Sequence, residues 1–473
     1  MHEPDLLTLM RGSITAPAGC GKTQLIADSL RRHSDSKPIL ILTHTNAGKS
    51  ALEDRLVKAK TAREAYRVAT IDSWAIRLIS KFPARSGHDR SIETLNNPNT
   101  DYAAIRVAAW TLLASDAITD ALKATYSRVF VDEYQDCTLP QHHIVSWLAQ
   151  VLPTCVLGDP LQAIFNFREA TVDWATDVLR MFPESRELST PWRWRNAGTE
   201  RLGNWLLEAR HALLAGQAID LRSAPAEVTW LAVPDAPDGA HRVRLLAAQT
   251  KAPVPHGSVL VIGDSTSPSG QRLVASQTPG ATTVEAVDLR DLTAFGQSFD
   301  PQKTNALETF VGFASELMTG LGVAQLLRRV QSIKSGTARN DATAVEAAAV
   351  AFSCAPSFDT AAAALRTFEE SPGVRVFRPE VLRVCLAAFD MAAKEGGSLS
   401  LAVARAREQN RHHGRPQIRR AVGSTLLLKG LEADTAIVLN PSDMNARHLY
   451  VALTRGARSL VICSRTPVLT PTP

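Results

Sequence analysis

The residues best suited to do chemistry begin at position 16, where the chain reads Ala-Pro-Ala-Gly-Cys-Gly-Lys-Thr. A short apolar stretch, residues 12–15, precedes this octet, and a helix is predicted after it, over residues 24–32. Backbone N–H groups in such a turn and at a helix start can bind phosphate oxygens. Lys22 would neutralise the β- and γ-phosphates, and Thr23 would ligate Mg²⁺. We assign nucleotide binding to Ala16, Ala18, Gly19, Cys20, Gly21, Lys22, Thr23 and Gln24. The alternative, a glycine-rich turn with an exposed lysine, is weaker because of the strand-turn-helix setting.

Two adjacent carboxylates follow another apolar stretch. Residues 129–131, Val-Phe-Val, lead directly into Asp132 and Glu133. One carboxylate at the end of such a strand can hold Mg²⁺ while the other takes a proton from attacking water. We assign Asp132 to the metal and Glu133 to the base. Alone, the pair is equally consistent with a plain strand end, but beside the octet it predicts phosphoryl transfer.

Phosphoryl transfer also needs a γ-phosphate sensor and cations that offset the charge of the transition state. Gln162 is the candidate sensor because it follows an apolar stretch and the turn Gly-Asp-Pro at residues 158–160. Spacing alone does not choose the cations, and a solvated surface charge is the alternative for any one arginine. The candidates are Arg193, Arg195, Arg447 and Arg455.

Aromatic residues are unevenly distributed, with all eight tryptophans between Trp74 and Trp230. Residues 192–195, Trp-Arg-Trp-Arg, interleave rings with cations. This pattern suits base stacking and phosphate contact, and core packing is the alternative. Residues 411–420 form a local basic run, which suits either a nucleic-acid backbone or a solvated linker.

The elements that would position these residues are those of an α/β fold. Strands are predicted over residues 12–15, 39–43, 66–70, 129–131, 155–157 and 186–189, with helices after most of them, as in a parallel sheet covered by helices. Residues 81–125 are predicted to be a helical insertion. A second sheet is predicted from strands at 228–233, 259–263, 424–428, 435–439 and 460–463. A helical block, residues 293–411, interrupts it.

Composition sets broad limits. The chain has 473 residues, about three domains' worth. Its formal net charge of +5 is too small to indicate nucleic acid by itself. We expect a cytoplasmic protein, because there is no secretory signal pattern and no apolar run of the ~20 residues that a membrane-spanning helix needs. The six cysteines lack any CxxC pair, which argues against a disulfide framework or a structural zinc.

Taken in order, these segments resemble the motif series of the UvrD/Rep-like superfamily 1 DNA helicases. Residues 16–23 resemble motif I, and residues 131–136, Val-Asp-Glu-Tyr-Gln-Asp, resemble motif II with high specificity. The other matches are residues 42–46 (motif Ia), 70–74 (Ic), 158–168 (III), 188–193 (IV), 429–432 (V) and 449–455 (VI). Eight segments in the family's order make chance an inadequate explanation.

The resemblance implies roles that spacing leaves open. It makes Arg193 and Arg455 the γ-phosphate arginines and Gln162 the residue that couples hydrolysis to DNA. Trp192 would stack on adenine, and Glu432 would contact the ribose. The implied DNA contacts are His44, Thr45, Asn46, Trp74, Phe165, Phe167, Arg168 and Ser424. Two positions of motif V that usually touch DNA are Leu426 and Leu427 here, which leaves Ser424 as the polar residue and weakens one contact.

The implied architecture is two RecA-like P-loop domains with helical accessory insertions. We place the first domain at residues 1–80 and 126–187, with a short insertion at 81–125. We place the second at 188–292 and 412–473, with a helical insertion at 293–411. ATP and Mg²⁺ would bind between the domains, with single-stranded DNA running across them.

The implied function is an ATP-dependent DNA helicase or translocase that moves from 3′ to 5′ and hydrolyses ATP when bound to single-stranded or tailed DNA. Only residues 456–473 follow the last motif, so we expect any nuclease to be a partner. In plan the chain resembles the helicase subunit of Gabija-type anti-phage systems, which works beside an OLD-family (Toprim) endonuclease. An alternative is an NTP-dependent DNA sensor that activates a nuclease and unwinds little. A P-loop kinase or transport ATPase is disfavoured by residues 131–136 and 429–432.

Overall fold

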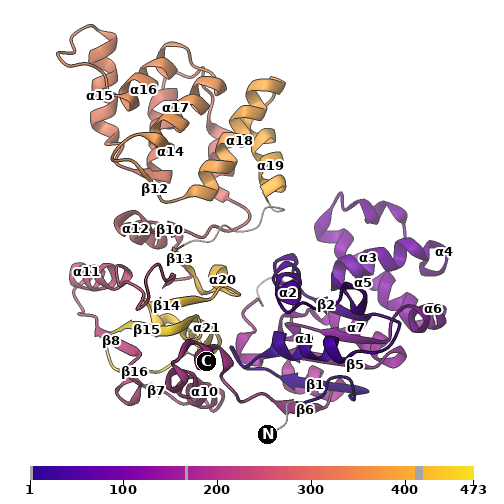
Figure 1. The fold of residues 1–473 in the computed structure, drawn as a ribbon. Coiled ribbons are helices and arrows are strands. Elements are labelled where there is room, and N and C mark those ends of the chain that lie inside the picture. Colours follow the sequence, from indigo (N-terminus) through magenta and orange to yellow (C-terminus); the bar gives the residue numbers. More distant parts are fainter. Residues whose placement is uncertain (1–3, 166–168, 411–418, 473) are drawn as a thin grey trace. The chain divides into compact units, whose positions relative to one another are not determined.

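The computed structural model describes residues 4–165, 169–410 and 419–472 and shows two six-stranded sheets flanked by helices (Figure 1). The first sheet contains β1 (Arg11–Thr15), β2 (Ile39–Thr43), β3 (Tyr66–Thr70), β4 (Arg128–Val131), β5 (Thr154–Gly158) and β6 (Glu184–Glu187). Their order is β3-β2-β4-β5-β1-β6, and every neighbouring pair is parallel. The predicted α/β fold is confirmed, and its architecture is consistent with two RecA-like domains.

Helices cover both faces of the first sheet because side chains alternate along each buried strand. Leu40, Leu42 and Val131 face a core shared with α3 (Ile71–Lys81), α5 (Pro98–Ala114) and α7 (Leu139–Val151). Ile39 and Phe130 face the opposite core, shared with α1 (Lys22–Arg32) and α2 (Asn46–Lys58). The shorter helices of this region are α4 (Pro83–Ser86), α6 (Thr119–Thr125), α8 (Leu179–Met181) and α9 (Trp192–Ala197), followed by the longer α10 (Glu200–Leu214).

The second sheet contains β8 (Val228–Ala232), β9 (Val259–Gly263), β10 (Thr282–Thr283), β13 (Arg420–Ser424), β14 (Ala433–Val438) and β15 (Gly456–Ser464). Their order is β10-β13-β9-β14-β15-β8. Its helices include α11 (Pro237–Ala248), α12 (Pro268–Gln277) and α20 (Thr425–Leu428). The strand predicted over residues 424–428 is wrong there, because Ser424 accepts a hydrogen bond from the Leu427 N–H and starts α20 instead.

Helices fill the region predicted as the larger insertion, drawn in orange in Figure 1. They are α13 (Arg290–Ser298), α14 (Ala306–Leu317), α15 (Val323–Lys334), α16 (Ala344–Cys354), α17 (Phe358–Glu370), α18 (Pro379–Glu395) and α19 (Leu399–Asn410). Their shared core is rich in phenylalanine, and the rings of Phe295 and Phe313 stack with centroids 3.9 Å apart. The structure also contains two short antiparallel strand pairs. They are β11 (Met318–Thr319) with β12 (Arg375–Val376), and β7 (Ile219–Asp220) with β16 (Val468–Leu469).

Contacts between residues group the chain into two compact units. The first comprises Met1–Val228, Ser442–Arg458 and Val468–Pro473, and so includes α21 (Ala446–Leu453). The second comprises Thr229–Pro441 and Ser459–Pro467. The four-segment domain division drawn from the sequence stays a prediction. In the part of the chain described here, no helix is both long and apolar enough to cross a membrane.

Candidate active site

The carboxyl ends of β1, β2, β4 and β5 lead into the predicted site residues. In a parallel sheet these strand ends lie along one edge, where α/β proteins place their ligands. The loop after β1 carries residues 16–21, and the loop after β4 carries Asp132 and Glu133. His44 follows β2, and Asp159 follows β5. Fold topology therefore gathers segments that are more than 100 residues apart in the sequence.

Two glycines give the loop after β1 its shape. Gly19 has φ +71° and Gly21 has φ +88°, in the left-handed region that side chains disfavour. A Cβ on Gly19 would lie 2.5 Å from the Trp194 ring, and one on Gly21 would lie 2.8 Å from the Trp192 ring. Gly21 is the N-cap of α1, whose first turn, fully described, contains no acidic residue. The loop therefore offers backbone N–H groups and a helix start without competing negative charge.

Lys22 lies between the two predicted catalytic carboxylates. Its Nζ is 2.8 Å from Asp132 Oδ1 and 2.5 Å from Glu133 Oε1. Burial alone would lower the pKa of the Lys22 ammonium, but the two carboxylates outweigh that effect, so its pKa is raised and it stays charged. For the carboxyl group of Asp132, burial has the opposite effect and raises the pKa, and Lys22 opposes that shift. The three charges form one cluster at the start of α1.

Glu133 adopts an uncommon backbone conformation, with φ +54°. Its N–H donates to Asp132 Oδ1 at 3.0 Å, the same oxygen that meets Lys22. Strain of this kind is often found at functional sites. Here it directs the Glu133 side chain to Lys22 on one oxygen and to Gln135 on the other.

A chain of hydrogen bonds connects Glu133 to the predicted sensor, Gln162. Gln135 Nε2 donates to Glu133 Oε2 at 2.6 Å, and Gln135 Oε1 accepts from the Asp159 N–H at 3.1 Å. Gln162 Nε2 then donates to Asp159 Oδ2 at 3.1 Å. Sequence reasoning assigned no role to Gln135 or Asp159, although both lie inside the segments singled out.

Arg210 is a further member of this chain that sequence reasoning missed. It is 1% exposed on α10, and its Nε and Nη2 atoms both lie 3.2 Å from Asp159 Oδ1. Its Nη1 bonds Glu187 of β6. One sequence signal was available: Arg210 lies on an apolar stripe of α10 with Leu206 and Leu213. A buried arginine in such a stripe needs an acidic partner.

The predicted γ-phosphate arginines lie in segments that contact the loop after β1. The Arg193 N–H donates to Gly19 O at 3.0 Å, and Arg193 Nη1 donates to Thr454 O at 2.6 Å. Arg455 is 3% exposed, and its Nε donates to Val451 O at 2.8 Å. Arg195, by contrast, forms an exposed ion pair with Glu200, as expected for a surface charge. Arg447 donates to Ala163 O at 3.5 Å, beside Gln162.

Tyr450 also reaches this loop, and sequence reasoning gave it no role. Its hydroxyl accepts a hydrogen bond from the Ala18 N–H at 3.0 Å. Burial raises the pKa of Tyr450 well above its usual range, so the hydroxyl stays protonated. Trp194 Nε1 donates to Gly456 O at 2.9 Å, a second tie between residues 192–195 and the segment after α21.

The remaining loop residues are placed as follows. Thr23 Oγ1, a predicted metal ligand, accepts from Arg55 Nη1 at 3.0 Å. Gln24 is exposed and donates to Asp28 at 2.8 Å. Ala16, Ala18 and Cys20 are buried, and burial raises the pKa of the Cys20 thiol to about 12. Oxygen atoms of Thr23 and Asp132 are the type of ligand that Mg²⁺ prefers, so the donor set fits this ion.

The predicted DNA contacts separate into two groups. His44, Thr45, Asn46 and Phe165 lie at the carboxyl edge of the first sheet, and the His44 and Phe165 rings have centroids 6.3 Å apart. Trp74 instead packs in the core, 3% exposed, so we no longer expect it to stack on a base. Phe167 and Arg168 lie outside the described residues.

Two predicted residues belong to the second compact unit. Ser424 is buried as the cap of α20, and its hydroxyl is used within the fold. Glu432 is exposed between α20 and β14. The roles of Glu432 at the ribose and of Trp192 at adenine stay predictions. Trp192 is partly exposed beside Gly21, with Arg195 above its ring at 5.3 Å.

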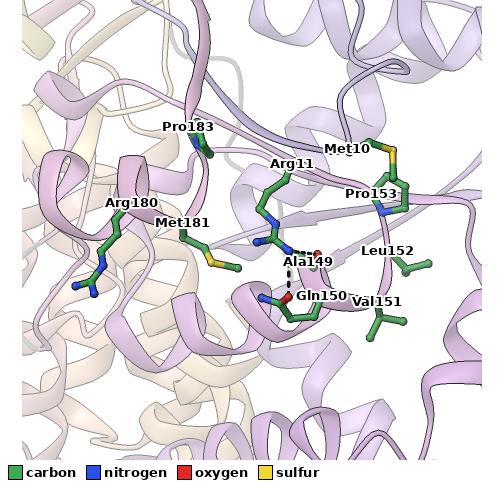
Figure 2. A pocket seen from close by; sticks show the side chains of 10 residues that line it. All are labelled: Met10, Arg11, Ala149, Gln150, Val151, Leu152, Pro153, Arg180, Met181 and Pro183. Carbon is green, nitrogen blue, oxygen red and sulfur yellow. Dashed lines mark hydrogen bonds between the residues drawn. The ribbon is translucent and has the colours of Figure 1, made fainter.

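A cavity of about 520 Å³ lies at the opposite edge of the first sheet (Figure 2). Arg11 starts β1, Pro153 directly precedes β5, and Pro183 directly precedes β6. Figure 2 shows Arg11 bonded to Ala149 O and to the Gln150 side chain, both at 3.1 Å. The five residues of β1 separate this cavity from the loop at residue 16 by about 15 Å. It is therefore distinct from the phosphate-binding edge.

A parallel sheet with a glycine-rich loop, a lysine and paired carboxylates at its carboxyl edge defines a P-loop nucleotide-binding fold. Residues 92–183 match the model of the UvrD/REP helicase N-terminal domain. This segment contains Asp132, Glu133, Asp159 and Gln162, whereas the loop at residue 16 lies before it. The match supports a UvrD/Rep-like helicase, a family that implies ATP-dependent action on DNA. No match is found among curated proteins.

Proposed function

We propose that this protein is an ATP-dependent translocase and helicase that hydrolyses ATP when it holds single-stranded DNA. One observation carries the proposal: Lys22, Asp132 and Glu133 form a charge cluster at the phosphate-binding loop, and hydrogen bonds continue from Glu133 to Gln162. The cluster has the parts that phosphoryl transfer needs, in reach of one another.

The residues divide the work as follows. Bound phosphates would take over the charge of Lys22, which releases the Glu133 oxygen that Lys22 now holds. Glu133 is then the base that accepts a proton from the attacking water. Arg193 and Arg455 supply the positive charge that offsets the negative charge developing in the transition state. Mg²⁺, held by Thr23 and Asp132, would neutralise phosphate charge.

Gln162 connects this chemistry to DNA. It starts a short segment that continues through Ala163 and Ile164 to Phe165, which lies beside His44. A change at the γ-phosphate that moves Gln162 is therefore transmitted over three residues to a ring at the predicted DNA-contacting edge. This short connection supports coupling between hydrolysis and stepping along DNA.

The test is steady-state ATP hydrolysis by the purified chain, with and without single-stranded DNA, at low and high salt. Stimulation by DNA that weakens with salt is expected, because phosphate contacts release counterions. The proposed 3′ to 5′ direction rests on the motif resemblance, and unwinding of duplexes with a 3′ or a 5′ tail tests it. Hydrolysis that is indifferent to DNA would contradict the translocase.

A second candidate is a DNA-sensing subunit that activates a partner endonuclease and unwinds little. The observation that favours it is that two positions of α20 where the resemblance implies polar DNA contacts are Leu426 and Leu427, near a buried Ser424. An OLD-family nuclease and a role in phage defence are the finer form of this proposal, and both rest on resemblance. Nucleotide-dependent stimulation of a co-expressed nuclease, with no strand separation, would favour the sensor over the helicase.

A further inference from the structure

Arg106, on α5, is the centre of a polar network outside the phosphate-binding loop. It is 7% exposed, and its Nε and Nη2 atoms meet the two oxygens of Asp72 at 2.7 and 2.8 Å. Its third nitrogen, Nη1, donates to Glu169 Oε2 at 2.6 Å. This two-pronged geometry is specific to a guanidinium, since a lysine ammonium cannot reproduce it.

A second branch of the network runs from Asp72 to His44. Gln141 Nε2 donates to Asp72 Oδ2 at 3.1 Å, which fixes the orientation of the Gln141 amide. Its Oε1 is 3.0 Å from His44 Nδ1, so that nitrogen carries the proton. In a neutral ring, Nε2 of His44 is then an acceptor. The Thr138 N–H also donates to Gln141 Oε1 at 3.1 Å, so the Gln141 amide is held from both sides. Arg106 is connected to His44 through Asp72 and Gln141.

The His44 branch ends at the edge where DNA contacts are predicted. His44 follows β2 and lies beside Phe165, and Asp72 is in the first turn of α3 after β3. Glu169 resumes the described chain four residues after Phe165. The network thus connects the predicted insertion, residues 81–125, to His44 and to Glu169.

Packing alone does not account for this charged centre. Apolar residues of α5, including Ile105, Ala109 and Leu112, already join α3 and α7 in one core. A buried ion pair adds little stability over an apolar substitute, because desolvation offsets the attraction. The specific gain is orientation, since each partner of Arg106 holds a separate segment in place.

We propose that Arg106 is a positioning residue that orients His44 and the chain at Glu169 for binding single-stranded DNA. The inference rests on the proposed function. Arg106 touches neither the nucleotide loop nor the catalytic carboxylates in the hydrogen bonds and ion pairs described. Its loss should therefore change the response to DNA and leave DNA-independent hydrolysis largely in place.

The experiment compares Arg106→Lys and Glu169→Gln with the wild type. The readouts are hydrolysis without DNA, the oligo(dT) concentration that gives half-maximal stimulation, oligo(dT) binding by fluorescence anisotropy, and Tm. For Arg106→Lys we expect the half-maximal concentration to rise about tenfold with DNA-free hydrolysis within about twofold, an effect of the size seen for indirect coupling. Glu169→Gln should shift it in the same direction by less.

The control is Glu395→Gln, which breaks an exposed arginine ion pair on α18 and should change none of these quantities. An unchanged DNA response in folded Arg106→Lys would overturn the proposal. So would an equal fall in DNA-free and DNA-stimulated rates together with Tm, which marks a purely structural role. If Arg106→Lys does not fold, Glu169→Gln decides, since its side chain is half exposed. A wild type without DNA stimulation would instead refute the proposed function.

Discussion

Lys22 is held by two carboxylates at once, and this shared ion pair explains how three charges coexist at the start of α1. The ionised form of Asp132 needs this cation, because burial and the neighbouring Glu133 both raise the Asp132 pKa, whereas Lys22 lowers it. Lys22, the proposed phosphate ligand, is therefore also the counter-charge of the two carboxylates.

Lys22→Ala should abolish ATP hydrolysis, with a loss of at least ~10³-fold, since it removes the positive charge that offsets the charge of the transferred phosphate. Thermal stability should also fall, because Asp132 and Glu133 lose their cation. The measurements are ATP turnover and Tm. Lys58→Ala on the exposed surface of α2 is the matched control. Appreciable turnover in the Lys22 variant would remove the loop from the mechanism.

Glu133→Gln should bind ATP and turn it over ~10²- to 10⁴-fold more slowly, since the shape is kept and the base is lost. ATP affinity and single-turnover rate, measured on the same preparation, separate the two effects. Glu64→Gln, at an exposed position before β3, serves as the control. Turnover equal to that of the wild type would show that another group accepts the proton.

At the scale of elements, the turn between β1 and α1 depends on backbone conformation as much as on side chains. Gly21→Ala adds a Cβ at a residue with a left-handed φ, and this atom would lie 2.8 Å from the Trp192 ring. We expect weaker nucleotide binding and a displaced Trp192.

Gly87→Ala is a matched control, because Gly87 also has a positive φ but nothing lies within 4 Å of the added atom. Both variants carry a backbone cost of about 1 to 2 kcal/mol. Nucleotide titration followed by tryptophan fluorescence distinguishes them, and equal affinities in the two variants would contradict a role for the Gly21 contact.

The central strands of the first sheet were predictable because they are short apolar runs, whereas the exposed edge strand β6, Glu-Ser-Arg-Glu, begins two residues before the predicted range. Strands β2 and β3 of this sheet, and β9 of the second sheet, begin and end where the sequence indicates. The start of α20 was missed since Leu-Leu-Leu suits a strand or a helix, and only the hydroxyl of Ser424 decides between them. Arg210, Tyr450 and Arg106 were missed for another reason: their partners are 51, 432 and 34 residues away, and spacing does not report such contacts.

At the scale of the whole molecule, burial separates the cysteines into two classes. Cys354 is exposed and the other five are buried. Burial raises the pKa of Cys155 to about 12 and that of Cys463 to about 11, so at pH 8 these thiols stay protonated and unreactive.

Mass spectrometry after brief maleimide treatment at pH 8 should find one modified cysteine in the native chain and six in urea. Raising the pH toward 9 should not make the buried cysteines react, because the pKa values of Cys155 and Cys463 lie well above pH 9. Rapid labelling of Cys20 in the native protein would show that the loop opens readily.

The bond between Ala18 and Tyr450 has a consequence for synthesis. Its two residues are 432 positions apart, so the loop leaves the ribosome long before its partner is synthesised. A nascent chain can form α1 early, yet it lacks both Arg455 and the Tyr450 hydroxyl that binds the loop until these residues have been translated. We therefore expect a product truncated before residue 450 to be catalytically silent, because it lacks Tyr450 and the proposed γ-phosphate arginine, Arg455.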